Sequence, residues 1–240
     1  MPIKKESHLY TFGFALVICV ACSFFLAAVS EGLKSRKELN MVQDVKKNIL
    51  KAVALKNPLP SRSGPREVLH VFQEKIEEAV IDAQGRFIAG KKPDAIQEGE
   101  EAYPLYIYRE QGAVVAYAFP VDGKGLWSTI YGYLAIEADG QTVRGVTFYK
   151  HGETPGLGAE IEKDWFQDNF KGKKIWDAAA RDRVPLTVVK GRVKDNIPAG
   201  RQSFYVDGIS GATMTCQGVS EILDRWLKVY EPFLKTIRKF

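Results

Sequence analysis

Cysteine and histidine are scarce in this chain, with three of each in 240 residues. Cys19 and Cys22 lie inside an apolar stretch, where small apolar side chains need no function, and Cys216 stands alone in the rest of the chain. The sequence therefore offers no disulfide framework outside that stretch. The histidines have no spacing typical of metal ligands, and no nucleophile, histidine and acid form a recognisable set. We expect neither a metal site nor a catalytic residue.

Phosphate-binding motifs and clustered charge are also missing. The chain has no glycine-rich loop that ends in Gly-Lys-Ser/Thr. Gly123 and Gly125 lack the third glycine of a dinucleotide-binding motif, so we interpret them as a turn. The formal net charge is +5, and the lysine and arginine residues are scattered along the chain. This pattern does not predict binding to nucleic acid.

One long uncharged run is present, at residues 9–29. About 20 helical residues cross a hydrocarbon core of roughly 30 Å. A cleaved signal peptide is the alternative, because residues 28–30 (Ala-Val-Ser) resemble a cleavage site. The run is longer than the usual signal core, and a helical apolar period continues after it, so we favour a retained transmembrane helix. Positive residues flank the run on both sides and do not fix its orientation.

The length suits one domain with an appendage, and we expect three parts. A transmembrane anchor covers residues 1–30, a helical stem and linker residues 31–64, and a main domain residues 65–240. A proline- and serine-rich break at residues 57–65 ends the stem.

The main domain is predicted to be α+β, with an antiparallel sheet and covering helices. Turn signals at Gly85, Gln111-Gly112 and Asp139-Gly140 separate short segments with a period near two, and short turns join antiparallel strands. The expected strands are 79–81, 86–88, 105–108, 113–117, 131–136 and 143–149. Helices are expected after residue 65, over residues 164–170, and at the C-terminus.

Residues 207–215 form a hydroxyl-rich loop that opens onto the C-terminal helix. The apolar face of this helix is predicted to consist of Val219, Ile222, Leu223, Trp226, Leu227 and Tyr230. A loop of small residues at a helix N-terminus leaves backbone N–H groups available to an anion such as a phosphate. The alternative is an ordinary helix cap formed by Ser210, Thr213 or Thr215.

A second loop spans residues 153–158 (Glu-Thr-Pro-Gly-Leu-Gly). Pro155 removes a backbone donor, and the two glycines permit close approach of the backbone to a flat ligand. The alternative is a plain connection between a strand and a helix.

These two loops carry a family resemblance. The Ser-Gly-Ala-Thr sequence at 210–213, with Asp207 before it and Thr215 after it, resembles the flavinylation motif of FMN-binding domains. Residues 151–158 and 125–132 resemble two further segments of these domains, in the same order. Together with the N-terminal apolar run, the whole chain resembles the C subunits of the sodium-translocating NADH:quinone reductases.

The resemblance implies a membrane-anchored protein that carries FMN covalently, through the flavin phosphate on Thr213, and transfers electrons within a sodium-pumping complex. It implies a cytoplasmic N-terminus and a main domain, the FMN-binding domain, on the periplasmic face of a bacterial inner membrane. The partners would be the other subunits, membrane lipid and a flavin transferase. The expected FMN-binding residues are Trp127, Tyr131, Glu153, Thr154, Gly156, Leu157, Gly158, Asp207, Ser210, Gly211, Ala212, Thr213 and Thr215. Core packing is the alternative for the two aromatic residues among them.

The chemistry of Thr213 also points to a separate enzyme. A threonine hydroxyl is a poor nucleophile without a base, and only Asp207 in the loop could serve as one. Two other functions stay open. One is the homologous flavin subunit of an Rnf-type ferredoxin:NAD oxidoreductase, and the other is a non-redox anchored binding domain in which Thr213 only caps the helix.

Overall fold

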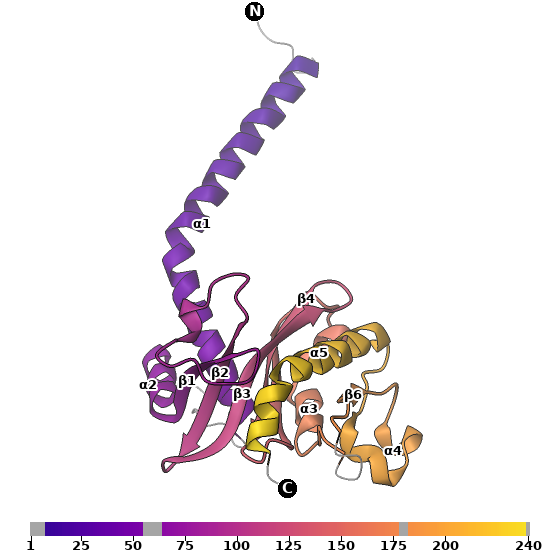
Figure 1. Cartoon of the computed structure of the whole chain (residues 1–240). Coiled ribbons are helices and arrows are strands. Elements are labelled where there is room, and N and C mark those ends of the chain that lie inside the picture. Colours follow the sequence, from indigo (N-terminus) through magenta and orange to yellow (C-terminus); the bar gives the residue numbers. More distant parts are fainter. Residues whose placement is uncertain (1–7, 55–63, 178–181, 239–240) are drawn as a thin grey trace, which may run out of the picture. The chain divides into compact units, whose positions relative to one another are not determined.

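The computed structural model describes residues 8–54, 64–177 and 182–238 (Figure 1). The chain divides into two compact units, Met1–Asp44 and Val45–Phe240. The division falls inside the first helix, α1 (His8–Val53), within the segment expected to be the stem. The expected break at residues 57–65 lies mostly outside the described residues.

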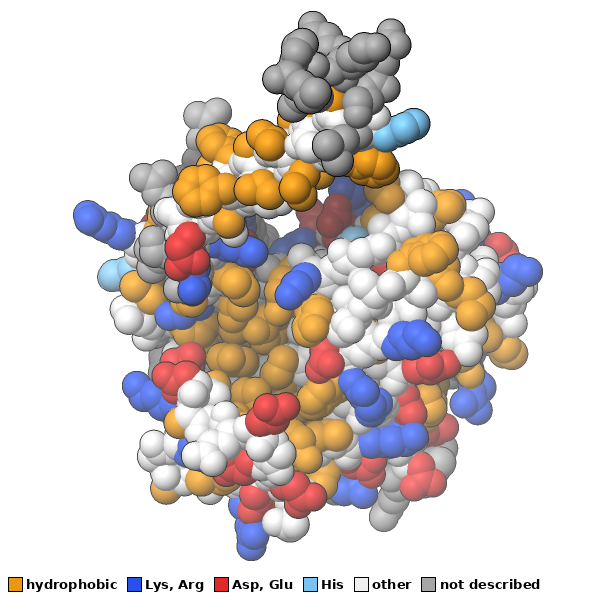
Figure 2. Space-filling view, turned by 90° about the horizontal axis from the view of Figure 1, so that it is seen from above, with side chains coloured by type: hydrophobic (Ala, Val, Ile, Leu, Met, Phe, Trp, Pro, Cys, Tyr) orange, Lys and Arg blue, Asp and Glu red, His pale blue; other side chains and the backbone are white. Residues whose placement is uncertain are grey.

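The first unit consists of the N-terminal part of α1. Among the described residues, Tyr10–Lys34 is the one stretch of helix long and apolar enough to cross a membrane, with a mean hydropathy of 2.6. None of its most apolar window is buried, and hydrophobic side chains cover the helix surface (Figure 2). An exposed apolar helix of this length matches a hydrocarbon core. The helix expected at residues 9–29 is therefore present.

The second unit is built on a five-stranded antiparallel sheet with the order β1-β2-β3-β4-β5. The strands are β1 (Ile76–Asp82), β2 (Ala102–Glu110), β3 (Ala113–Lys124), β4 (Thr129–Glu137) and β5 (Val143–Lys150). Each strand pairs with its neighbour in sequence, and the pairs β2–β3 and β4–β5 are those that the turn signals at Gln111-Gly112 and Asp139-Gly140 predict. The α+β fold class is thereby confirmed.

Two of the three turn signals in the sequence correspond to turns between neighbouring strands of the sheet. Gln111 and Gly112 have φ angles of 51° and 82°, the left-handed conformations that a tight hairpin requires. Asp139 closes the turn between β4 and β5, because its carboxylate accepts hydrogen bonds from the amides of Gln141 and Thr142. The strand expected at residues 86–88 does not form. This segment makes only one isolated bridge, between Ile81 and Phe87.

The two faces of the sheet are covered by different helices. Helix α5 (Thr213–Ile237) packs on the face that carries Leu105, Phe119 and Leu134. The end of α1 and helix α2 (Pro65–Lys75) pack on the opposite face, with Tyr106 and Tyr133. Alternate residues of one strand thus enter different cores, which is the period of two that defines a strand. The predicted apolar face of α5 is confirmed, with Trp226 partly buried at its edge.

The remaining elements are short; η1 (Pro93–Ala95) lies between β1 and β2, and the others connect β5 to α5. The others are η2 (Gly158–Glu162), α3 (Asp164–Gln167), η3 (Asp168–Phe170), β6 (Thr187–Val188), α4 (Val193–Asn196), η4 (Ala199–Phe204) and β7 (Tyr205–Val206). Elements α3 and η3 occupy the expected helical segment 164–170. The parallel pair β6–β7 is an element that the sequence pattern did not predict.

Helix α5 lies very close to the end of β3. A Cβ atom on Gly218 would stand 2.7 Å from the carbonyl oxygen of Lys124, a distance that side chains do not tolerate. Only glycine therefore permits this approach. The contact brings the first turns of α5 next to the loop that follows β3.

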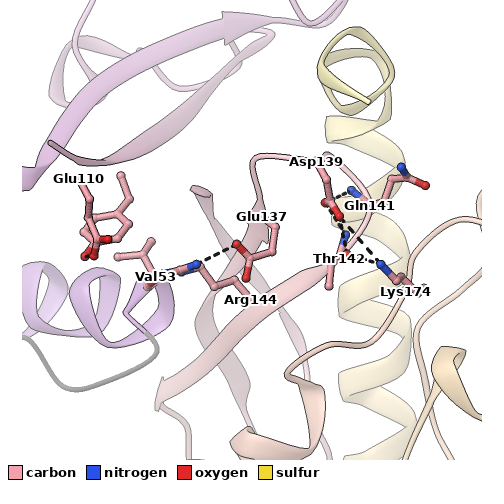
Figure 3. Close-up of polar contacts among 9 residues, drawn as sticks. Val53, Glu110, Glu137, Asp139, Gln141, Thr142, Arg144 and Lys174 are labelled. Atoms are coloured by element: carbon pink, nitrogen blue, oxygen red, sulfur yellow. Dashed lines mark hydrogen bonds and ion pairs between the residues drawn. The ribbon is translucent and has the colours of Figure 1, made fainter. Parts of the chain in front are cut away.

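The end of α1 is bound to the sheet through a buried arginine (Figure 3). Arg144, in β5, donates a hydrogen bond to the carbonyl oxygen of Val53 and forms an ion pair with Glu137 at 2.8 Å. A cation at a helix C-terminus satisfies an otherwise unpaired carbonyl group and complements the helix dipole. Ile49 and Leu50, in the same turns, are fully buried. The last turns of α1 are therefore part of the Val45–Phe240 unit.

We predict that Leu50→Ala lowers the free energy of unfolding by about 2–5 kcal/mol, because it leaves a cavity between α1 and the sheet. The matched control is Val42→Ala on the same helix, where the side chain is exposed and the change should stay within about 0.5 kcal/mol. The free energy of unfolding of both variants is measured by chemical denaturation of a shortened chain that begins at Lys34. We expect this shortened chain to be soluble, because its apolar residues recur periodically and do not form one continuous run. Equal stabilities of the two variants would contradict the packing of Leu50 between α1 and the sheet.

Candidate functional site

Three segments that are far apart in the sequence meet at one place in the Val45–Phe240 unit. They are the loop at residues 125–128 between β3 and β4, the loop at 151–157 after β5, and the N-terminus of α5. These are the segments that carry the family resemblance. The side chain of Glu153, in the second of these segments, contacts both of the others.

The Glu153 carboxylate is a buried bridge between the three segments, in a residue that is 5% exposed. Its Oε1 accepts a hydrogen bond from the amide of Trp127 at 3.0 Å, and its Oε2 accepts one from the hydroxyl of Thr215 at 2.6 Å. Burying a carboxylate without hydrogen-bond partners would lower the stability of the fold strongly. A buried carboxylate that accepts several hydrogen bonds instead holds its donors in place.

The same contacts determine the ionisation of Glu153. Burial acts to raise its pKa, but hydrogen bonds from Thr215 and from the amides of Trp127, Leu126 and Ser128 outweigh burial. The pKa of Glu153 is consequently below its ordinary value of 4.5. The carboxylate is therefore ionised at neutral pH.

Two glycines allow the segments to approach. A Cβ atom on Gly158 would lie 2.6 Å from the Thr215 hydroxyl. Gly211 has a φ angle of +76°, and its Cβ would lie 2.9 Å from a methyl carbon of Leu157. Larger residues at these positions would separate the 151–157 loop from α5. The packing of the site thus requires glycine at two of the three expected positions, Gly158 and Gly211.

Further hydrogen bonds hold the two sheet-end loops together. The Ser128 hydroxyl accepts a hydrogen bond from the amide of Gly152 at 2.5 Å. The Nδ1 atom of His151 accepts one from the amide of Glu153 at 3.2 Å. The backbone on both sides of Gly152 is therefore fixed.

The N-terminus of α5 has no side-chain cap among the described residues. The cap position is Ala212, which cannot accept a hydrogen bond, and the Thr215 hydroxyl binds Glu153 instead. The alternative interpretation, in which Ser210, Thr213 or Thr215 caps the helix, is therefore wrong. The first-turn amides and the positive end of the helix dipole remain available to an anion.

Thr213 is exposed and borders a recess of about 170 Å³ between α5 and β6. Lys190 and Cys216 line the same recess. Sequence reasoning missed Lys190, because only the long-range contact of β6 with α5, where the Val188 amide donates to the Ser220 hydroxyl, places it at this recess. The apolar run at residues 184–189, with a single threonine in it, was the signal that could have indicated this strand.

The predicted aromatic residues lie in different environments. Trp127 is 70% exposed, which rules out core packing for its side chain. Tyr131, in β4, is half-buried, with the ammonium group of Lys150 4.9 Å from its ring centre. Leu157 and Met214 are exposed on the other two segments. Trp127, Leu157 and Met214 thus each stand exposed on one of the three segments, and we refer to them below as the rim of the site.

Asp207 has a partner elsewhere. Its Oδ1 accepts a hydrogen bond from the amide of Val193 at 2.7 Å, at the start of α4. The aspartate that precedes the Ser-Gly-Ala-Thr sequence thus fixes the neighbouring loop. Of the remaining expected residues, Thr154, Gly156 and Ser210 are exposed on the two loops. No group of three potential metal ligands occurs in residues 8–54, 64–177 or 182–238.

We predict that Glu153→Gln lowers the free energy of unfolding by about 1–3 kcal/mol at pH 7, because the amide nitrogen cannot accept a hydrogen bond. The pKa of Glu153 is lowered in the folded state, so its stabilising contribution is present above pH 4.5 and is lost as the pH falls through the lowered pKa. The difference in the free energy of unfolding between the unchanged chain and Glu153→Gln should therefore shrink as the pH is lowered below 4.5. Chemical denaturation at several pH values measures this difference.

The control is Glu98→Gln, at an exposed glutamate in the loop before β2. This variant should unfold like the unchanged chain at every pH. A Glu153→Gln protein with unchanged stability at pH 7 would show that Glu153 does not hold the loops together.

Comparisons with known proteins agree with this geometry. A family model described as an FMN-binding domain matches residues 125–228, which include all three segments. The C subunit of the Na+-translocating NADH-quinone reductase of Yersinia pestis is 32% identical, over 99% of this chain and 96% of its own length. The corresponding protein of Pseudomonas aeruginosa is also 32% identical, and the alignment covers 98% of both chains.

A solved structure shows the same fold. The crystal structure of the C subunit from Parabacteroides distasonis aligns with a TM-score of 0.71 and 33% sequence identity, over 84% of this chain and 96% of its own. The shared fold, the full-length similarity and the three segments around Glu153 lead to one conclusion. The chain belongs to the family of C subunits of the Na+-translocating NADH:quinone reductases.

Proposed function

We propose that this chain is a membrane-anchored electron-transfer subunit that holds FMN covalently, through a phosphoester on Thr213, in a sodium-pumping NADH:quinone oxidoreductase. The observation that carries the proposal is the position of Thr213. Its exposed hydroxyl stands in the first turn of a helix whose N-terminus no described side chain caps.

The surroundings of Thr213 suit a phosphate. A phosphodiester carries a negative charge, and uncapped N–H groups at a helix N-terminus stabilise such a charge. Lys190 lines the recess beside Thr213 and supplies a positive side chain. The site therefore combines an attachment point with two sources of positive potential.

The rim of the site suits a flat aromatic ring. Exposed large apolar side chains that gather at one place commonly mark a binding surface. Trp127, Leu157 and Met214 offer such a surface beside the loops that Glu153 fixes. We expect Thr154, Gly156, Ser210 and Tyr131 to contribute at its edges. FMN, when bound, supplies one- and two-electron redox chemistry that side chains lack.

The chain does not itself activate the Thr213 hydroxyl in this proposal. Asp207, the one base considered from the sequence, binds the amide of Val193. The Glu153 carboxylate is already occupied by Thr215 and by backbone amides. A hydroxyl without a base is a poor nucleophile, so a flavin transferase is proposed to form the ester.

The N-terminal helix is proposed to anchor the protein in the bacterial inner membrane, with the main domain on the periplasmic side. The apolar stretch Tyr10–Lys34 supports the anchor by its length and exposure. The proposed parts are the anchor at residues 1–30, the stem and linker at 31–64, and the FMN-binding domain at 65–240, on which the last turns of α1 pack. The other subunits of the complex would be its electron-transfer partners.

We predict that Thr213→Ala abolishes covalent flavin without unfolding the chain. Because the Thr213 hydroxyl caps nothing, the change in stability should stay within about 0.5 kcal/mol. In-gel flavin fluorescence after denaturation reads the attachment, and thermal unfolding reads the fold. Thr129→Ala, at an exposed threonine of β4, is the matched control and should stay fluorescent.

Ser210→Ala should reduce the fluorescence less than Thr213→Ala, since Ser210 would only support recognition. Fluorescence retained by Thr213→Ala would refute the attachment site.

A second prediction concerns the transferase. Chain produced in a compartment without a flavin transferase should fold but be colourless, and co-production with the transferase in the same compartment should restore the colour. The reason is that Asp207 and Glu153 are both engaged elsewhere. Absorption spectra of the purified chains measure the outcome. If unflavinylated chain mixed only with FMN or FAD became covalently yellow, the site would have to contain a base of its own.

A further inference from the structure

The site contains a buried histidine that the proposed chemistry does not use. The His151 side chain is 8% exposed and lies at the start of the loop that carries Glu153. Its Nδ1 accepts the hydrogen bond from the Glu153 amide at 3.2 Å. Its Nε2 is buried, has no hydrogen-bond partner among the described residues, and lies 3.5 Å from Oε2 of Glu162.

This geometry is compatible with only one protonation state of the ring. A ring nitrogen that accepts a hydrogen bond carries no proton, so the proton of neutral His151 is on Nε2, on the side of Glu162. A protonated ring would also carry a proton on Nδ1, opposite the N–H of Glu153. Two donors cannot form a hydrogen bond, and the contact would be lost.

The charged groups around His151 strengthen this contrast. Glu162, in η2, faces Nε2 and is also paired with Lys163 at 2.8 Å. Glu153, on the loop side, holds its own charge through Thr215 and backbone amides. Protonation would thus increase the attraction of the ring to Glu162 while it removes the contact to the Glu153 backbone.

We propose that His151 is a positioning residue: its unprotonated Nδ1 holds the backbone amide of Glu153 through a hydrogen bond, and protonation of the ring breaks this hydrogen bond. This hydrogen bond is called the lock below. The Glu153 carboxylate joins the 125–128 loop to α5, so the state of one ring nitrogen controls the alignment of all three segments. The lock exists without flavin. Its effect on a bound flavin rests on the proposed function.

The test uses the full chain in detergent, labelled with 15N at histidine. The chain has only three histidines, and the His151→Asn variant identifies the signal of His151. Long-range 15N–1H correlation spectra at pH 8 should show a neutral ring protonated at Nε2. A neutral ring protonated at Nδ1, or a charged ring at that pH, would overturn the proposal.

Hydrogen exchange of the Glu153 amide tests the lock itself. After correction for intrinsic exchange rates, protection at pH 8 should be roughly five- to tenfold higher than at a pH where His151 is charged. In His151→Asn the amide oxygen can replace Nδ1 as acceptor and does not titrate, so protection should be retained at both pH values. In His151→Leu it should be lost at both.

The control is His70→Asn, because His70 also faces a glutamate, Glu74 at 3.8 Å, but is exposed on α2. This variant should behave like the unchanged chain. The same exchange pattern is expected in the Thr213→Ala background, where no flavin can be attached in the proposed way. The inference about His151 is contradicted if protection of the Glu153 amide in the unchanged chain does not depend on pH, or if it stays intact in His151→Leu. If only the proposed function is wrong, this exchange pattern is unchanged and only the flavin readouts differ from expectation.

Discussion

The buried carboxylate of Glu153 is the interaction on which the site depends. It accepts hydrogen bonds from the amide of Trp127 and from the Thr215 hydroxyl, so one side chain joins two loops at the end of the sheet to the start of α5. Its charge is maintained inside the protein because these donors outweigh the cost of burial. Removing the carboxylate would leave its donors, the Trp127 amide and the Thr215 hydroxyl, without this acceptor, which explains how one side chain holds the three segments together.

The rest of the fold positions the helix that carries Thr213. The sheet buries α5 along its apolar face, and the close approach at Gly218 fixes the first turns beside the loop after β3. The opposite face of the sheet receives the end of α1, which Arg144 holds at Val53. A rigid sheet covered on both faces therefore supports the loops, as is common for binding sites in proteins.

Local patterns in the sequence were sufficient to predict most helices, strands and turns, but not the contacts between them. The Asp139-Gly140 turn and the apolar face of α5 were predicted because each depends on neighbouring residues. The strand at 86–88 was expected on the same grounds, but the structure forms only one bridge there. The role of Glu153 could not be predicted, since its partner Thr215 is 62 residues away. Lys190 was missed for the same reason, because long-range packing of β6 against α5 places it at the recess that Thr213 also lines. The family resemblance indicated the segments, and the structure adds how they are held.

We propose that the uncapped N-terminus of α5 presents Thr213 to the flavin phosphate. Peptide mapping by mass spectrometry of the native protein, purified from its own cells, can locate the attachment. We expect one FMN phosphoester, on Thr213, within the peptide that contains the Ser-Gly-Ala-Thr sequence. An unmodified peptide, or an adduct on Ser210 or Thr215 instead, would contradict this proposal.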